Sequence, residues 1–291
     1  MMAVTARRTP VLGSWMAHRE VGHGRPVLLL HGNPTSSYLW RHVLAAAASR
    51  DTEHRWIAVD LIGMGDSGKP AIAYRLLDHL AHVDALIEAL ELDDLVLVGH
   101  DWGVAIAMDL LRRRTAAVRG IAVMEGHLRP LPGWDAFDDG GRELFARLRT
   151  PGEGERMVLE EDFFLRTLLP AAVQRPLAAE DLDAYRSPYP RPEDRTPLLQ
   201  WAREIPVADD PADVAALMAA ASAHWTSART PRLLLHGEPC VLTTDRTVEW
   251  ARSTGSGLTI RSVGGPAGHF LPEDRPAEVS AALLEWVATL G

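Results

Sequence analysis

A strand that ends in a glycine-flanked turn and then enters a helix constrains this chain more than any other feature. Residues 95–98 form an apolar run typical of a buried strand, and residues 104–111 form one typical of a helix. Gly99-His100-Asp101-Trp102-Gly103 stands between them. This order is typical of a nucleophile elbow, which holds one side chain at the carboxyl edge of a parallel sheet. Glycine is needed on both sides because a β-carbon there would collide with the neighbouring backbone.

Asp101 occupies the position of the nucleophile in this turn. A carboxylate needs no base to deprotonate it, and its attack on carbon leaves an ester on the protein. An aspartate at this position therefore favours displacement at a saturated carbon over transfer of an acyl group.

Other apolar runs repeat the alternation of strand and helix along the chain. Apolar side chains recur at helical spacing in residues 80–90 and again in residues 279–286. Strand-like runs occupy residues 27–31, 56–60, 120–125, 232–236 and 258–263. This alternation predicts an α/β fold in which helices cover both faces of a mostly parallel sheet.

The alternation stops between residues 130 and 225. This stretch is rich in charges and short helical patterns, and its residues 186–193 include prolines that interrupt both helix and strand. We therefore expect a helical cap domain over residues 130–225, which lies above the carboxyl edge of the sheet. Residues 1–129 and 226–291 would form the core domain.

Composition excludes several classes of protein. Apolar residues make up 47% of the 291 residues, which is enough for one large core plus an insertion, and the net charge of −9 argues against nucleic-acid binding. No apolar run approaches the roughly 18 residues that cross a bilayer. Cys240 is the only cysteine, which fits a reducing compartment. We expect a monomeric cytoplasmic protein without a metal, other cofactor, nucleic-acid partner or membrane partner.

Two further motifs follow predicted strands. His31-Gly32-Asn33-Pro34 follows the first clear strand, where such a fold supplies part of an oxyanion hole, although an ordinary Asn-Pro turn is the alternative. Trp102 directly follows Asp101. Its indole N–H is a neutral donor that can hold a departing anion, and a packed core aromatic is the alternative interpretation.

Glu125 and His269 complete a catalytic set in the chain order nucleophile, acid, histidine. Glu125 ends the strand after the elbow helix, at the edge where catalytic groups collect. The acid often follows the next strand instead, but Cys240 occupies that position, which leaves Glu238 and Asp245 as rival candidates.

His269 lies after the last strand and before the final helix. Most of the twelve histidines, such as His79 and His82 on a predicted helix, are expected at the surface instead.

Together these motifs resemble those of the haloalkane dehalogenases in the α/β-hydrolase superfamily. The resemblance is carried by HGNPTSSYLW at residues 31–40, DLIGMGDSGKP at residues 60–70, His100-Asp101-Trp102-Gly103 and Met124-Glu125. It runs from about residue 13 to the C-terminus, and it is to the branch with an Asn halide donor and a Glu acid.

The resemblance implies an eight-stranded α/β-hydrolase fold and a role for each residue of the set. Asp101 would be the nucleophile, His269 the base and Glu125 its partner, and Asn33 and Trp102 would hold the halide. The substrates would be a small apolar halogenated compound and water, and a primary alcohol, a halide ion and a proton would be released.

The substrate pocket is less well defined by the sequence. Candidates for its apolar lining are Trp134, Phe137, Phe164, Val241, Leu242 and Phe270. Gly126-His127 and the loop of residues 237–240 depart from the family pattern, so they leave the pocket shape open.

Three other functions compete with this interpretation. An epoxide hydrolase also uses an aspartate nucleophile but needs paired cap tyrosines, for which Tyr185 and Tyr189 are the candidates. Tyr74-Arg-Leu-Leu-Asp-His79 and Arg203-Glu-Ile-Pro206 resemble marine coelenterazine luciferases, which share this fold. A binding receptor on an inactive fold is disfavoured, because all five expected polar groups are present.

Overall fold

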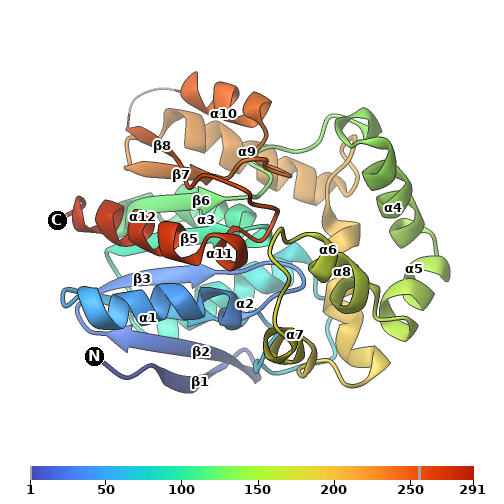
Figure 1. The fold of residues 1–291 in the computed structure, drawn as a ribbon, viewed down its shortest axis with the longest axis horizontal. Coiled ribbons are helices and arrows are strands. Elements are labelled where there is room, and N and C mark those ends of the chain that lie inside the picture. Colours follow the sequence, from blue (N-terminus) through green and yellow to red (C-terminus); the bar gives the residue numbers. More distant parts are fainter. Residues whose placement is uncertain (1, 255–256) are drawn as a thin grey trace.

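The computed structural model describes residues 2–254 and 257–291, and its centre is one eight-stranded sheet (Figure 1). The strands lie in the order β1-β2-β4-β3-β5-β6-β7-β8. β1 and β2 pair antiparallel, as do β2 and β4, and all other neighbours are parallel, which confirms the predicted sheet. The strands are β1 (Thr5–Val11), β2 (Ser14–Gly22), β3 (Arg25–Leu30), β4 (His54–Val59), β5 (Leu95–His100), β6 (Val118–Met124), β7 (Arg232–His236) and β8 (Leu258–Ser262).

Helices cover both faces of the sheet, which explains why the central strands are apolar along their whole length. Every residue of β5 is buried, so its side chains face apolar neighbours on both sides. In Figure 1, α1 (Arg41–Arg50) and α12 (Pro276–Ala288) lie in front of the strands, whereas α2 (Leu76–Ala89) and α3 (Trp102–Arg113) lie behind them.

Shorter elements complete this part of the chain. α10 (Asp245–Arg252) follows β7, and α11 (Leu271–Asp274) precedes α12. Two 3₁₀ turns, η1 (Ser37–Trp40) and η2 (Thr115–Ala117), precede α1 and β6. Within the described ranges, no helix is both long and apolar enough to cross a membrane.

The chain between β6 and β7 is helical, and all of it except its last helix gathers at one end of the sheet (Figure 1). Its α-helices are α4 (Asp139–Arg149), α5 (Glu153–Glu155), α6 (Leu169–Ala171), α7 (Ala179–Arg186), α8 (Thr196–Glu204) and α9 (Ala212–Ser227). The 3₁₀ turn η3 (Trp134–Ala136) precedes α4. The π-helical turns η4 (Arg156–Glu160) and η5 (Phe164–Leu168) and the 3₁₀ turn η6 (Pro192–Arg195) lie between the later helices. α9 packs against α3 of the core, although most of α9 falls within the predicted cap domain of residues 130–225. The division between cap and core at residue 226 therefore stays a prediction.

Buried charges hold this helical segment to the core. Arg41 on α1 contacts Glu273 on α11 at 2.6 Å and Asp181 on α7 at 2.9 Å. Glu273 is fully buried, and it also accepts a hydrogen bond from the hydroxyl of Tyr185. A buried carboxylate is stable only when its oxygens are paired, so α1, α7 and α11 are held in one arrangement.

Candidate active site

The turn between β5 and α3 brings Asp101 to the carboxyl edge of the sheet in a strained backbone conformation. Asp101 has φ 53° and ψ −122°, values that side chains rarely adopt. A β-carbon on Gly99 would lie 2.5 Å from the carbonyl oxygen of Gly103, and one on Gly103 would lie 2.1 Å from that of Leu30. The backbone N–H of Asp101 donates to the carbonyl of Glu125 at 3.1 Å, which ties this turn to the end of β6. As predicted, a β-carbon at either position would collide with the backbone, so the elbow requires glycine at both.

The loop after β3 reaches the carboxylate of Asp101. The backbone N–H of Asn33 donates to its Oδ1 at 2.7 Å. A β-carbon on Gly32 would lie 2.0 Å from the same oxygen, so only glycine lets the loop approach this closely. Leu61 N–H donates to Nε2 of His31, whose Nδ1 therefore carries a proton and donates to the carbonyl of Gly32. Burial lowers the pKa of His31 to about 4, so a neutral imidazole supports this loop.

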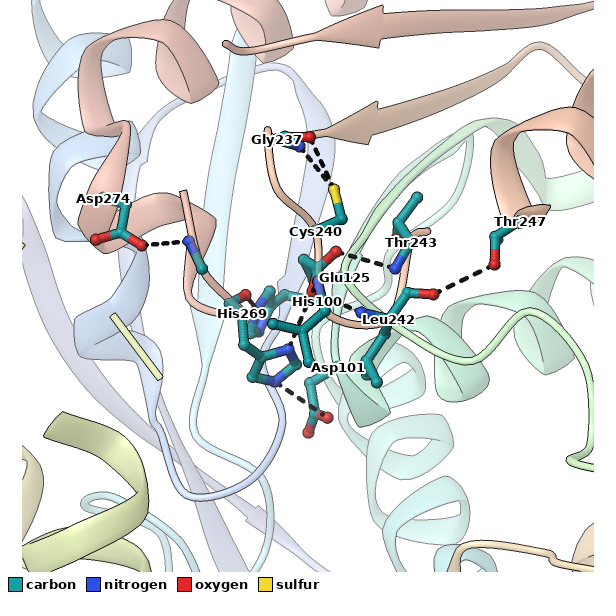
Figure 2. Close-up of polar contacts among 12 residues, drawn as sticks. His100, Asp101, Glu125, Gly237, Cys240, Leu242, Thr243, Thr247, His269 and Asp274 are labelled. Atoms are coloured by element: carbon teal, nitrogen blue, oxygen red, sulfur yellow. Dashed lines mark hydrogen bonds and ion pairs between the residues drawn. The ribbon is translucent and has the colours of Figure 1, made fainter. Parts of the chain in front are cut away.

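The imidazole of His269 lies between two carboxylates (Figure 2). Its Nε2 is 3.5 Å from Oδ2 of Asp101, and its Nδ1 is 3.4 Å from Oε2 of Glu125. Burial by itself would lower the pKa of His269, but its hydrogen bonds and charge interactions with the two carboxylates raise it to about 9. Burial would raise the pKa of Asp101, yet His269 and the backbone N–H of Trp102 outweigh it, so the pKa is lowered. Asp101 is therefore an ionised carboxylate beside a protonated imidazole.

Glu125 is fully buried, and the loop after β7 surrounds its carboxylate (Figure 2). Its Oε2 accepts backbone N–H bonds from Val241 at 3.1 Å and Leu242 at 3.0 Å, and its Oε1 accepts one from Thr243 at 3.0 Å. Burial would raise the pKa of Glu125, but His269 and these N–H groups hold it below the usual value.

The two rival acids lie elsewhere. Glu238 is exposed and accepts a hydrogen bond from Ser262, and Asp245 starts α10. Of the three candidates, Glu125 alone contacts His269 among the described residues.

The backbone around His269 is anchored on both sides. His100 Nε2 donates to the carbonyl of His269 at 2.8 Å, and the N–H of His269 donates to Ala172 at 3.0 Å. The N–H of Gly268 donates to Asp274 at 2.7 Å. Because His100 and Ala172 come from β5 and the helical segment, the position of the imidazole depends on both.

Trp102 and Asn33 lie beside the Asp101 carboxylate at the floor of a cavity. The indole of Trp102 stacks on Trp201 of α8, with ring centroids 4.7 Å apart, and Trp201 stacks on His79 of α2 at 4.1 Å. The side-chain amide of Asn33 donates to the carbonyl of Leu198 at 3.1 Å. Packing across α2 and α8 therefore orients the indole, and one amide N–H of Asn33 remains for another acceptor.

His79 and His82 are buried, so the expectation that they lie at the surface is wrong. His79 lies beneath Trp201, and burial lowers its pKa well below the usual value, so it is neutral. Nδ1 of His82 forms a hydrogen bond with the backbone carbonyl of Asp78. The sequence did not identify Trp201 as a site residue, since its partners lie on other helices.

A cavity of about 690 Å³ opens above Asp101, between the sheet edge and the helical segment. Of the predicted lining residues, Phe137, Phe164, Val241 and Leu242 line it. Trp134 and Phe270 do not, because Trp134 packs on Phe137 and the fully buried Phe270 packs against His100 and His269. Lining residues that the sequence did not single out include Ala105, Leu128, Leu131, Phe145, Leu168, Ala172, Ala202, Ile205 and Met218.

The two departures after β6 have separate roles. A β-carbon on Gly126 would lie 2.5 Å from the side chain of Val104, so the turn after Glu125 requires glycine. His127 lines the cavity, where burial lowers its pKa. The floor of the cavity is thus polar, and most of its wall is apolar, as expected for a small-molecule site.

Most of the residues that suggested other functions lie away from the cavity, although Ile205 of the second luciferase-like motif lines it. Neither Tyr185 nor Tyr189 is among the residues that line it. The two luciferase-like motifs meet in an ion pair, in which Arg75 contacts Glu204 at 3.0 Å and the backbone N–H of Leu76 contacts the same carboxylate. Within residues 2–254 and 257–291, no three His, Cys, Asp or Glu side chains group in a way that could hold a metal ion.

The chain is similar to known proteins over nearly its whole length. The model for the α/β-hydrolase fold family matches residues 25–175. A haloalkane dehalogenase from Bradyrhizobium diazoefficiens is 42% identical, over 98% of this chain and 94% of the relative. One from Sphingobium indicum is 40% identical, over 96% and 94%.

Solved structures agree with these sequence relationships. The haloalkane dehalogenase DbeA from Bradyrhizobium elkani superposes with a TM-score of 0.95 at 40% identity, over 99% of both chains. The haloalkane dehalogenase DatA from Agrobacterium tumefaciens superposes with a TM-score of 0.92 at 36% identity, over 99% of this chain and 98% of that one.

Proposed function

This chain belongs to the haloalkane dehalogenase family of α/β hydrolases and hydrolyses carbon–halogen bonds, and we propose that it does so through an ester on Asp101. The observation that carries this mechanism is the imidazole of His269, 3.5 Å from Asp101 and 3.4 Å from Glu125. A base between a carboxylate nucleophile and a buried acid suits a two-step hydrolysis.

In the first step, Asp101 attacks the carbon that bears the halogen. A carbon–oxygen bond forms as the carbon–halogen bond breaks, and the halide leaves with the electron pair. The indole N–H of Trp102 and the side-chain amide of Asn33 hold that anion. Because the cavity wall is mostly apolar, water competes little for the carboxylate, which strengthens its attack.

In the second step, His269 takes a proton from water, which attacks the carbonyl carbon of the ester. The backbone N–H groups of Asn33 and Trp102 stabilise the oxyanion, each by roughly 3 kcal/mol. Glu125 holds the imidazole and balances its positive charge. A primary alcohol and a proton are released, and Asp101 is regenerated.

The raised pKa of His269 implies that its imidazole becomes available as a base only after the first step. In the free protein both carboxylates raise that pKa, to about 9, so the imidazole carries a proton at neutral pH. An ester on Asp101 has no charge, so the contribution of Asp101 to this pKa disappears once the first step is complete. His269 then loses its proton more readily and is available as a base for the ester that has just formed.

An epoxide hydrolase would need acidic hydroxyls facing the nucleophile. Tyr185 instead donates to Glu273, and Tyr189 is buried away from the cavity. The ion pair between Arg75 and Glu204 accounts for the luciferase-like motifs. No observation therefore favours either alternative. The lone cysteine fits a reducing compartment, so a cytoplasmic location is part of this proposal, as is a monomeric state.

The test is to trap the ester. His269→Phe and His269→Gln should each release about one halide per protein from 1,2-dibromoethane and then stall. Intact-protein mass spectrometry should find the bromoethyl group, and peptide mapping should place it on Asp101. His23→Phe, at an exposed loop position, is the matched control and should turn over normally. Repeated turnover by both His269 variants, or a label on another residue, would contradict the assigned roles.

A further inference from the structure

We propose that the mouth of the cavity binds an anionic group, so that the preferred substrates are haloalkanes with a carboxylate at the end remote from the halogen. Arg129 and Arg246 would hold that carboxylate while the halogen-bearing carbon reaches Asp101. This inference rests on the proposed function of the same cavity.

Both arginines line the cavity that contains Asp101. Arg129 follows the end of β6, and Arg246 lies in the first turn of α10. Neither forms an ion pair with an acidic side chain in the part of the chain that the structure describes, although most other arginines there do. Burial lowers the pKa of Arg129, and the neighbouring charge of Arg246 lowers it further. Two unneutralised guanidinium groups in one cavity wall create a local excess of positive charge.

The guanidinium of Arg129 packs on an aromatic ring, a contact that uses none of its N–H donors. Its central carbon lies 4.4 Å from the ring centroid of Trp250 on α10. A guanidinium stacked by its face keeps its edge N–H groups free, and that fork matches the two oxygens of a carboxylate. Lysine would lack this geometry.

The start of α10 adds to the same wall. Thr244 and Thr247 line the cavity beside Arg246, and Thr244 makes no side-chain capping bond to the first turn of the helix. The free N–H groups of a helix N-terminus carry partial positive charge, so they favour an anion next to the arginines.

The lining of the same cavity also includes two acidic side chains. Asp135 and Asp138 come from the helical segment, and Asp138 caps α4 by accepting from the N–H of Gly141 at 2.7 Å. Neither aspartate pairs with the arginines in the described structure. The arginines would attract an anion and the aspartates would repel it, which gives the proposal a test in each direction.

The reaction itself is unchanged. A haloalkanoate and water give a hydroxyalkanoate, a halide ion and a proton, and Asp101 forms and loses the ester as above. No oxidant, reductant or further reactant is required.

The experiment compares each carboxylate with its neutral methyl ester. kcat/KM is measured for 4-chlorobutanoate, 6-chlorohexanoate, 8-chlorooctanoate and their methyl esters, with 1-chlorohexane as an uncharged reference. At the chain length that spans the cavity, the carboxylate should exceed its ester by about 10-fold, because each solvent-accessible charge pair contributes up to about 5-fold. The advantage should arise in KM and shrink at 0.5 M salt, because salt screens exposed charges.

Four variants separate this site from a general charge effect. Arg129→Gln and Arg246→Gln should each reduce the carboxylate preference by about 3- to 5-fold and leave 1-chlorohexane unchanged. Arg252→Gln, in the last turn of α10 and outside the cavity, makes the same charge change and should have no effect. Asp135→Asn should increase the preference.

The outcomes distinguish this inference from the function beneath it. Hydrolysis of the neutral compounds without any carboxylate preference, or a preference that survives Arg129→Gln and Arg246→Gln together, would overturn the anionic site and leave the dehalogenase mechanism intact. No halide release from any compound would overturn both.

Discussion

Replacing Glu125 by glutamine tests the centre of the proposed site, because the change removes a charge and alters almost no volume. The carboxylate of Glu125 faces three backbone N–H groups and the Nδ1 of His269. All four are donors to an acid that has no exposed surface. A glutamine amide has one acceptor and one donor end, so it cannot satisfy this arrangement.

The loss of stability expected in Glu125→Gln follows from the positions of the four donors around the carboxylate. The better amide orientation keeps its oxygen near Val241 and Leu242 and turns its NH₂ toward the N–H of Thr243 at the 3.0 Å position. One buried donor is then unsatisfied, at a cost of about 1–3 kcal/mol, and the three charge-assisted bonds from Val241, Leu242 and His269 become neutral, at about 1 kcal/mol each. Relief of the desolvation of a buried charge offsets part of this loss. The free energy of unfolding should fall by about 2–4 kcal/mol, which lowers Tm by roughly 3–7 °C.

The kinetic effect should be confined to the second step. Asp101 needs no base for its attack, so rapid-quench assays of Glu125→Gln should still find a full burst of halide. Steady-state turnover should fall by at least about 10²-fold, because His269 loses the charge that balances its protonated form. Glu238→Gln is the matched control, since it makes the same change at an exposed position in the loop after β7. If both variants had equal Tm values and equal turnover, Glu125 would not be the acid.

Three further changes test the surrounding geometry. His269→Gln should destabilise the fold by about 3 kcal/mol more at pH 6 than at pH 9.5 in urea titrations. Folding raises the pKa of His269 from 6.5 to about 9, so the stabilisation by its protonated form is complete below pH 6.5 and is lost as the pH rises through 9. An equal loss of stability at the two pH values would contradict the ion pairs of His269 with Asp101 and Glu125. Gly32→Ala should reduce kcat by at least about 10²-fold in steady-state assays, since its β-carbon would lie 2.0 Å from Asp101. Trp201→Leu should weaken halide binding by roughly 3- to 10-fold, measured by quenching of tryptophan fluorescence, because it removes the ring stacked on Trp102; unaltered affinity would show that the stack does not orient the indole.

The sequence predicted the sheet and the grouping of the candidate catalytic residues because both are encoded locally. An elbow needs glycine at positions 99 and 103, and the structure gives each a backbone carbonyl within 2.5 Å of the missing β-carbon. In a parallel sheet, residues that end neighbouring strands meet at one edge, so Asp101 after β5 and Glu125 after β6 had to lie close together. Position along the chain was therefore sufficient to bring these two carboxylates into one site.

The cavity wall could be predicted only in part, because it depends on how separate helices face one another. Phe270 directly follows His269, yet its ring turns into the core between His100 and His269. Met218 lies on α9 and Phe145 on α4, and only the packing of those helices over the sheet directs them to the cavity. Helical spacing identifies an apolar face but does not say what that face contacts.

A neutral side chain at position 240 supports the role proposed for Glu125, which directly follows β6. The thiol lies in the loop that surrounds Glu125, with its sulfur 2.9 Å from the carbonyl of Gly237. Burial raises the pKa of Cys240 to about 12, and the charge of Glu125 contributes to the shift, so the thiol stays neutral. An aspartate at position 240 would place a second negative charge beside Glu125, and two adjacent buried carboxylates cannot both ionise at neutral pH. A neutral side chain here is therefore a condition for Glu125 to remain charged and to hold His269.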